Sequence, residues 1–281
     1  MKLSIIIVNW NTTNLLINLL DSIYKFAPDC EFEIIAVDNN SNNFDIDEIS
    51  KKYPLVNFIT NTKNAGYAEG NNQALEIAKG EYSLLLNPDT EMTAGSISEL
   101  LSFMDNHPEA ASVGSKLVRP DGEIDKSVRS FPTPGAVGFE MMGLSKLFPD
   151  SKVFGAYRMT WFDYSQICEV DQPMGSCLML SGKVLKEIGN FDLNFPIFFN
   201  EVDWLYRAKQ AGYKVYFDPN AVVIHHGAAS TKQAGKIPMK LESHVSLLRF
   251  YEKHYKAKIN PIVYWFTIIC IRLSIATNCR A

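Results

Sequence analysis

The sequence predicts an α/β protein with a Rossmann-like, mainly parallel sheet, helices on both faces of that sheet, and further helices at the C-terminal end. Three observations support this fold class. Short apolar runs alternate with helix-like segments through the first half of the chain. The runs end in small polar clusters, as buried parallel strands do. No Gly/Ser-rich or Pro-rich linker divides the 281 residues into independent halves.

The first half is expected to follow the order β-α-β-α-β-α-β-α-β. One helix is predicted around Leu15 to Ile23, where apolar residues keep helical spacing, and another from Tyr67 to Ala78, ended by Gly80. The five predicted strands are bounded by polar and turn residues. They run from Leu3 to Val8, Phe32 to Val37, Val56 to Ile59, Tyr82 to Leu86 and Ala111 to Leu117.

The second half predicts three more strands, three helices and an aromatic loop. The strands are Met174 to Leu180, Tyr213 to Phe217 and Val222 to Ile224, and the loop is Phe191 to Phe199. The helices are Lys183 to Ile188, Asn200 to Ala211 before Gly212, and Lys240 to Tyr255. We therefore expect a principal domain over residues 1–255 and a helical C-terminal segment over residues 256–281.

Composition narrows the classes of protein to consider. A formal net charge of -4 and a pI near 5.8 give no electrostatic reason to bind nucleic acid. The five cysteines are widely spaced and form no Cys-x-x-Cys pair, so we expect reduced packing residues. The apolar N-terminal run is too short for a signal peptide and is interpreted as a strand. We expect a cytoplasmic protein.

Polar clusters follow four consecutive strands of the predicted sheet. They begin at Asn9, Asp38, Asn61 and Asn87, directly after or one residue beyond the last apolar residue. Ligands of such sheets bind in the crevice beyond the carboxyl ends of the strands. The four clusters therefore predict one site at this edge.

The motifs occur in a recognisable order. They are Ser4 to Asn11, Val37 to Ser41, Asn64-Ala65-Gly66, Leu86 to Thr90, Met174-Gly175-Ser176, Gly189 to Asp192, Asn200 to Asp203, Arg207, Gly212 and His225. Over roughly residues 1–255 this pattern resembles family 2 glycosyltransferases of the GT-A fold, and its rhamnosyltransferase-like members in particular. The resemblance implies an enzyme of cell-surface polysaccharide biosynthesis that uses an NDP-sugar and Mg2+ or Mn2+ and inverts the anomeric carbon. dTDP-rhamnose is the preferred donor and UDP-hexoses come next, with a saccharide or lipid-linked saccharide as acceptor.

The resemblance implies a metal ligand at Asp89, within Asn87-Pro88-Asp89-Thr90. A hard cation that shares its shell with phosphates needs only one or two protein carboxylates. In this sequence Asn87 replaces the first acid of the family's Asp-x-Asp motif, which lowers the expected negative charge at the metal. The alternative interpretation is an ordinary turn. His225 matches a family histidine near the metal and diphosphate, although a structural role and the adjacent His226 both remain open.

The donor nucleotide is expected to contact Asp38, which matches the family's acid that binds the nucleoside. The same carboxylate could instead cap its Asn-rich loop. Other candidates lie at the ends of the strands or in a loop over the donor, although Asn-rich loops are also ordinary turn chemistry. They are Asn9, Trp10, Asn11, Asn39, Asn64, Gly66, Asn71 and Asn87.

Glu201 is the candidate general base, because it matches the second member of the family's acidic pair, with Asn200 in place of the first. Asp203 is the first alternative for this catalytic role. The competing interpretation is that Asn200 and Asp203 mark a helix N-terminus, where negatively charged side chains interact favourably with the helix dipole. Phe198, Phe199, Trp204 and Trp161 either form a wall for a sugar ring or pack in the core.

The apolar stretch from Ile262 to Ala276 is shorter than the ~20 residues that span a bilayer, and Arg272 interrupts it. It predicts either an interfacial helix at the inner face of the membrane or a last helix packed on the domain. Two other functions remain as alternatives: a nucleotidyltransferase that makes NDP-sugars, and a non-catalytic sugar-nucleotide-binding protein. The sequence has no Gly-rich phosphate loop after the first strand, which argues against the nucleotidyltransferase. Asn87 and Asn200 stand where the family has acids, which keeps the non-catalytic alternative open.

Overall fold

The computed structural model describes residues 1–42, 44–227 and 236–278. Its centre is one large sheet in the strand order β3-β2-β1-β4-β10-β6-β11-β5, with β8 paired to β11. A two-stranded sheet of β7 and β9 lies apart from it. The strands are β1 (Leu3–Asn9), β2 (Phe32–Asp38), β3 (Val56–Thr60), β4 (Tyr82–Leu86), β5 (Thr90–Met92), β6 (Ala110–Val118), β7 (Val128–Arg129), β8 (Cys168–Glu169), β9 (Gln172–Pro173), β10 (Cys177–Ser181) and β11 (Lys214–His225).

The sheet is mainly parallel, as predicted. Strands β3, β2, β1 and β4 run in parallel, β10 is antiparallel to both β4 and β6, and β11 is parallel to β6. The helices are α1 (Thr13–Lys25), α2 (Ile46–Lys52), α3 (Tyr67–Ile77), α4 (Ser96–Asn106), α5 (Pro134–Met141), α6 (Leu144–Leu147), α7 (Gly182–Ile188), α8 (Asn200–Gln210), α10 (Lys236–His254) and α11 (Pro261–Asn278).

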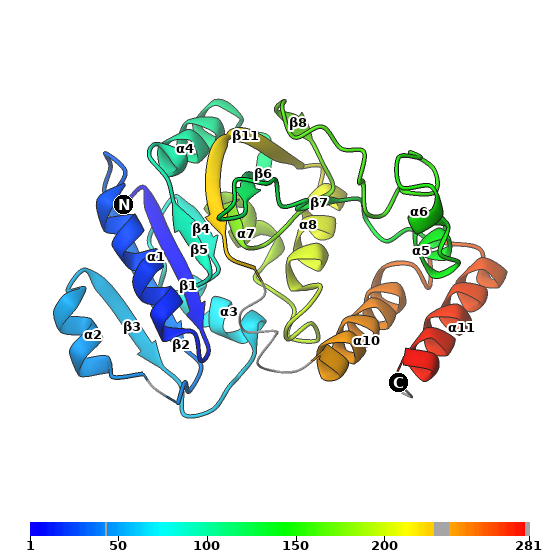
Figure 1. Cartoon of the computed structure of the whole chain (residues 1–281), viewed down its shortest axis with the longest axis horizontal. Coiled ribbons are helices and arrows are strands. Elements are labelled where there is room, and N and C mark those ends of the chain that lie inside the picture. The colour runs from blue at the N-terminus through cyan, green and yellow to red at the C-terminus, as the bar shows by residue number, and fades with distance from the viewer. Residues whose placement is uncertain (43, 228–235, 279–281) are drawn as a thin grey trace.

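Two apolar clusters cover the two faces of the sheet, because successive strand residues point to opposite sides. Ile5 and Ile7 of β1 pack with α1, α2 and α4, whereas Ile6 and Val8 belong to the cluster that includes α3, α7, α8, α10 and α11. Figure 1 shows α10 and α11 side by side at the far end of the molecule, next to α5 and α6. The predicted three-layer arrangement is therefore confirmed.

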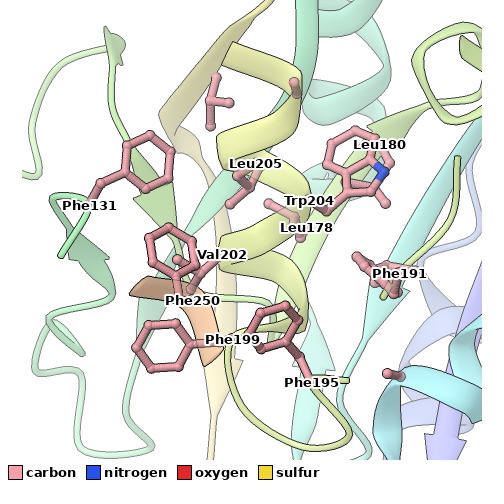
Figure 2. Packing of buried hydrophobic residues seen from close by; sticks show 14 of the residues in the cluster. Phe131, Leu178, Leu180, Phe191, Phe195, Phe199, Val202, Trp204, Leu205 and Phe250 are labelled. Atoms are coloured by element: carbon pink, nitrogen blue, oxygen red, sulfur yellow. The ribbon is translucent and has the colours of Figure 1, made fainter. Parts of the chain in front are cut away.

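The aromatic residues of α8 and the preceding loop lie in the cluster that contains Ile6 and Val8 (Figure 2). Trp204 is completely buried, and its Nε1 donates to the carbonyl oxygen of Gly189 at 3.0 Å. Phe199 is also buried and packs near Phe250 of α10. For these two side chains the core-packing interpretation is correct.

Several predicted boundaries were wrong. Helix α3 ends at Ile77, one residue before the predicted Ala78. A Cβ on Gly80 would lie 2.4 Å from the backbone nitrogen of Ser4, so this glycine permits a close approach of two chain segments. The strand predicted from Met174 begins only at Cys177. The two strands predicted between Tyr213 and Ile224 form one strand, β11, with an irregularity between Asp218 and Val222.

The C-terminal segment forms helix α11, which packs on α5 and α10 through one face. Tyr264, Ile268 and Ile271 are buried in the core cluster. The opposite face leaves Ile262, Trp265, Phe266, Ile269 and Leu273 exposed. Within the described ranges, none of the helices has the length and apolar character needed to cross a membrane.

Four of the cysteines are free and unpaired with one another, as expected. Cys279 lies outside the described residues.

Candidate active site

Asp38 and Asn9 end two neighbouring parallel strands and lie opposite each other in register. Asn9 Nδ2 donates to Asp38 Oδ1 at 2.7 Å, and the Ser41 backbone N–H donates to Oδ2 at 2.8 Å. The Ser41 hydroxyl donates to Oδ1 at 2.6 Å. The carboxylate therefore caps its own loop, as the alternative interpretation predicted. Because two carboxylate oxygens offer about four acceptor positions, its nucleoside contact remains a prediction.

Asn39 joins this loop to the start of α3. Its Nδ2 donates to the carbonyl oxygen of Gly66 at 3.0 Å, and its Oδ1 accepts from Asn61 Nδ2 at 2.8 Å. Asn64 Oδ1 accepts from the Gly66 backbone N–H at 2.9 Å. Gly66 has a φ of +93°, and a Cβ there would lie 3.0 Å from the carbonyl oxygen of Pro196. The position therefore requires glycine for both conformation and space.

Three other residues predicted to contact the nucleotide are Trp10, Asn11 and Asn71. Asn11 has a φ of +55°, and its backbone N–H donates to the Ser41 hydroxyl at 2.7 Å. Trp10 is partly buried beside it. Asn71 lies inside helix α3, is 1% exposed and donates to the carbonyl oxygen of Tyr67 at 2.8 Å. The sequence interpretation that placed Asn71 in a closing loop was wrong, because the helix begins four residues earlier.

The loop between β3 and α3 lines an open groove of about 480 Å³. Its lining includes Asn61, Lys63, Asn64, Gln73, Leu193 and Pro196, and it contains none of the predicted metal or base residues. Figure 1 places α3 beneath the central sheet, at the edge where these strands end. The groove therefore continues the predicted nucleotide region at Asn64, and the residues predicted to bind the metal or act as base do not line it.

The segment from Asn87 to Thr90 is a turn and also presents a buried acid. The Thr90 backbone N–H and hydroxyl both donate to the Asn87 carbonyl oxygen, at 3.1 and 2.7 Å. Asp89 is 7% exposed. Asn87 Nδ2 donates to the Ser176 hydroxyl at 3.0 Å, which ties this turn to the segment before β10. The turn interpretation is therefore confirmed, and the metal-ligand role of Asp89 stays a prediction.

His225 ends β11 beside this turn. Its Nε2 lies 3.6 Å from Asp89 Oδ1, and its Nδ1 lies 2.8 Å from Asp125 Oδ2. Burial lowers the pKa of His225, but the contacts with Asp125 and Asp89 outweigh it and raise the pKa to about 9. The hydrogen bond from His225 in turn lowers the pKa of Asp125. His226 instead faces Glu91, with Nε2 and Oε1 2.8 Å apart, so His225 is the histidine at the site.

Asp125 was missed by the sequence analysis, although a signal was present. Pro120-Asp121-Gly122 is a strong turn sequence directly after β6, and Gly122 has a φ of +87°. The turn reverses the chain, so that the Asp125 backbone N–H donates to the Leu117 carbonyl oxygen at 2.9 Å. Because β11 runs beside β6, this reversal brings Asp125 next to His225.

Asp89 and His225 fit a cation that is shared with a ligand. Over residues 1–42, 44–227 and 236–278, no three His, Cys, Asp or Glu side chains are arranged to hold a metal ion by themselves. A cation bound to a diphosphate takes most of its ligands from phosphate and water, so one carboxylate and one imidazole are sufficient. The two groups converge within 3.6 Å, which is close enough to contact the same ion.

Glu201 lies in the first turn of α8, after Phe199 turns the chain with a φ of +69°. A Cβ on Gly175 would lie 3.4 Å from Glu201 Cγ, so the Glu201 side chain lies beside this glycine. Burial raises the pKa of Glu201. The Tyr67 hydroxyl donates to the Gly175 carbonyl oxygen at 3.5 Å, and the next residue, Ser176, accepts a hydrogen bond from Asn87 in the turn that carries Asp89. The Gly175–Ser176 segment therefore connects the Glu201 side chain with the Asp89 turn.

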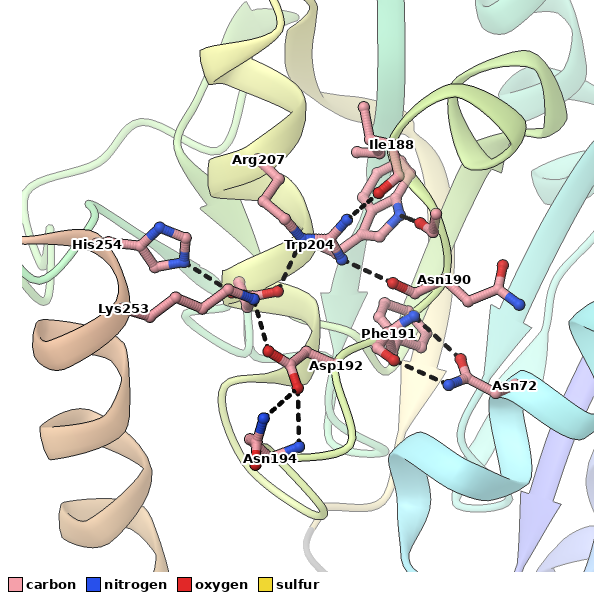
Figure 3. A network of polar contacts seen from close by, with 12 residues as sticks. Asn72, Ile188, Asn190, Phe191, Asp192, Asn194, Trp204, Arg207, Lys253 and His254 are labelled. Carbon is pink, nitrogen blue, oxygen red and sulfur yellow. Dashed lines mark hydrogen bonds and ion pairs between the residues drawn. The ribbon is translucent and has the colours of Figure 1, made fainter.

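Asp203 has a different environment, although it is only two residues away. It is completely buried, and Arg207 Nε, His254 Nε2 and Lys253 Nζ lie 2.9, 2.7 and 2.7 Å from its carboxylate oxygens. Burial raises the pKa of Asp203, but these three partners outweigh it and lower the pKa below its ordinary value. Figure 3 shows Lys253 and His254 extending from α10 toward α8. The group is a buried ion-pair centre that joins two helices.

Helix α8 begins at Asn200 and has Glu201 and Asp203 in its first turn, as the helix-start interpretation predicted, but no side chain caps its first backbone N–H groups. The residue before the helix is Phe199, which provides no side-chain cap. Asn200 Nδ2 donates back to the Ile197 carbonyl oxygen at 2.8 Å, and Asp203 faces the cationic groups of α10 and Arg207. Glu201 alone of the two acids remains beside the site, without an ion-pair partner among the described residues.

Comparisons with known proteins bear on the family and the fold of this chain. The model of the family described as "Glycosyl transferase family 2" matches residues 4–166. The N-acetylglucosaminyl-diphospho-decaprenol L-rhamnosyltransferase of Mycobacterium tuberculosis is 28% identical over 218 residues, which cover 74% of this chain and 70% of that protein. The low-salt glycan biosynthesis hexosyltransferase Agl10 of Haloferax volcanii is 27% identical, over 74% of this chain and 62% of that protein.

Two solved structures share the fold at lower identity. The mannosyltransferase PcManGT of Pyrobaculum calidifontis, in complex with GDP-Man and Mn2+, superposes with a TM-score of 0.62 and 15% identity, over 99% of this chain and 72% of that one. TarS of S. aureus in complex with UDP has a TM-score of 0.54 and 16% identity, over 94% of this chain and 68% of that one. The predicted GT-A fold is thereby confirmed.

Proposed function

This chain belongs to glycosyl transferase family 2, and on that premise we propose that it moves a sugar from an NDP-sugar donor to a glycan acceptor with inversion. Rhamnose from dTDP-rhamnose is the preferred donor, because a relative named as an L-rhamnosyltransferase is 28% identical. UDP-sugars come second, since a structural neighbour binds UDP. The same rhamnosyltransferase is named for a lipid diphosphate acceptor, which supports a lipid-linked saccharide as the acceptor class.

The observation that carries this proposal is that the Gly175–Ser176 segment contacts both Glu201 and the turn that carries Asp89. A direct displacement needs a base for the acceptor hydroxyl and stabilisation of the departing diphosphate. Glu201 is partly buried, and its raised pKa makes it a stronger base than an exposed glutamate. We assign the base to Glu201 and a structural role to Asp203, whose carboxylate already contacts Arg207, Lys253 and His254.

Asp89 and His225 are the residues that would hold Mn2+ or Mg2+. Such a cation supplies Lewis-acid stabilisation of the negative charge that develops on the diphosphate. A neighbour of the same fold contains Mn2+ together with its nucleotide sugar, which supports this assignment. Asp38 and its neighbours Asn9 and Ser41 are proposed to bind the nucleoside through acceptor positions that the hydrogen bonds among them leave available.

The exposed face of α11 supports contact with an anionic membrane surface. Trp265 and Phe266 are 55% and 66% exposed, Lys258 is exposed just before the helix, and Arg272 is exposed within it. Apolar side chains combined with basic residues favour the interface of an anionic bilayer. A lipid-linked acceptor would be reached at that surface, and residues 256–281 would then form a membrane-contacting segment beside a catalytic domain of residues 1–255.

Transfer assays test the function directly. Purified protein is incubated with Mn2+ and a panel of NDP-sugars, and donor binding is followed by thermal shift, because a ligand that binds only the folded state raises the melting temperature. We expect dTDP-rhamnose to give the largest shift and the fastest transfer to a lipid-linked saccharide. Binding of every donor without transfer or donor hydrolysis would instead indicate a non-catalytic protein.

A further inference from the structure

Asp125 has no role in the function proposed so far, yet it contacts the histidine of the candidate cation site. Its Oδ2 accepts a hydrogen bond from His225 Nδ1 at 2.8 Å. The His225 side chain is 6% exposed and that of Asp125 is 22% exposed, so the contact is largely shielded from water. The two residues are 100 positions apart in the sequence, and only the reversal after β6 brings them together.

The contact determines which ring nitrogen faces the site. An imidazole that donates its Nδ1–H to a carboxylate leaves the Nε2 lone pair for another partner once it is neutral. His225 Nε2 is the nitrogen that faces Asp89, at 3.6 Å. A carboxylate behind a metal-binding histidine commonly fixes its orientation and tautomer in this way.

We propose that Asp125 is a positioning residue that orients His225 Nε2 toward a divalent cation held with Asp89. This inference rests on the proposed function, because the cation is the one shared with the donor diphosphate. Asp125 itself is placed to act through the histidine, since its bonded partner is Nδ1, on the side of the ring away from Asp89.

The chain offers a matched control in the neighbouring pair. His226 Nε2 and Glu91 Oε1 are also 2.8 Å apart, and Glu91 is two residues from Asp89 in sequence. Glu91→Gln therefore removes a histidine-bound carboxylate close to Asp89 without touching His225. A general loss of negative charge would appear in this variant, whereas a loss of His225 orientation would not.

The experiment measures Mn2+ binding to the full chain by electron paramagnetic resonance of the free ion, with the melting temperature of each variant as a fold check. We expect Asp125→Asn to raise the Kd for Mn2+ by about 10–100-fold, the usual effect of removing such a partner. Glu91→Gln should stay within about twofold of the wild type. In a His225→Gln background, Asp125→Asn should add less than about twofold, because the two residues act as one unit.

Three results would overturn the inference. The first is an Asp125→Asn variant that binds Mn2+ like the wild type while Asp89→Asn does not. The second is an equal loss from Asp125→Asn with and without His225, and the third is an equal loss from Glu91→Gln; both would mean that Asp125 contributes only charge. If instead the wild type binds no Mn2+, or Asp89→Asn binds it normally, the cation site of the proposed function fails as well.

Discussion

Glu201→Gln and Asp203→Asn each remove one carboxylate, two residues apart on α8, and we expect opposite consequences. Asp203 is completely buried, and Arg207, Lys253 and His254 lie within 3 Å of its oxygens. The loss of hydrogen bonds between charged groups costs about 1.5–3 kcal/mol, because the Arg207 and Lys253 side chains are 19% and 34% exposed and water can solvate them. At about 2–4 °C per kcal/mol for a chain of this size, the melting temperature should fall by about 3 °C or more.

Glu201→Gln should leave stability unchanged or slightly higher. Burial raises the pKa of Glu201, so the folded protein disfavours its charged form, and a neutral amide avoids that cost. A glutamine cannot accept the proton of the acceptor hydroxyl, so kcat should fall by about 10²-fold or more. Donor affinity should barely change, because a general base acts in the chemical step.

One set of measurements separates the two residues. For each variant, kcat is measured in a transfer assay, donor affinity by titration and the melting temperature by thermal unfolding. Turnover of Asp203→Asn is compared with the wild type at a temperature well below both melting transitions. If Asp203→Asn abolishes turnover there while Glu201→Gln remains active, the base is Asp203 and the assignment above is refuted.

Three further predictions follow from the same structure. Because burial raises the pKa of Glu201 and only its deprotonated form accepts a proton, kcat should rise with pH through a midpoint above about 4.3, the ordinary glutamate value. Trp265→Glu together with Phe266→Glu should reduce co-sedimentation with anionic vesicles by about 10-fold or more, whereas Leu55→Glu, at a 66% exposed leucine near β3, should not. Truncation after Ala257 removes the buried face of α11, whose three apolar side chains stabilise by about 1.5–3 kcal/mol each, so the melting temperature should fall by about 10 °C or more.

Each of these has a clear contrary outcome. A midpoint at or below the ordinary glutamate value would mean that the carboxylate is not desolvated in the working enzyme. Equal vesicle binding by the α11 and Leu55 variants would remove α11 from the membrane contact. A truncated chain with an unchanged melting temperature would show that α11 adds no packing energy to the domain.

Local patterns were sufficient for the fold. The five strands predicted in the first half were placed to within one residue at each end, since continuous apolar runs bounded by polar clusters describe buried parallel strands well. The short strand β5 was not predicted. The boundaries that were wrong depend on neighbours: Gly80 is explained by the backbone of Ser4, and β10 starts late because the chain before it belongs to the segment tied to Asn87.

The convergence of Asp89 and His225 could also be anticipated, because both follow strands that end at one edge of the sheet. The sequence by itself thus determined which chemistry is gathered at that edge. The resemblance ranked Glu201 above Asp203, but their local surroundings on α8 are almost the same and give no physical basis for that order. Only the tertiary structure decided that Lys253 and His254, about 50 residues later, contact Asp203, and that Asp125 supports His225. Periodicity and turn chemistry act over a few residues, whereas burial and charge partners are set by elements that meet only when the chain has folded.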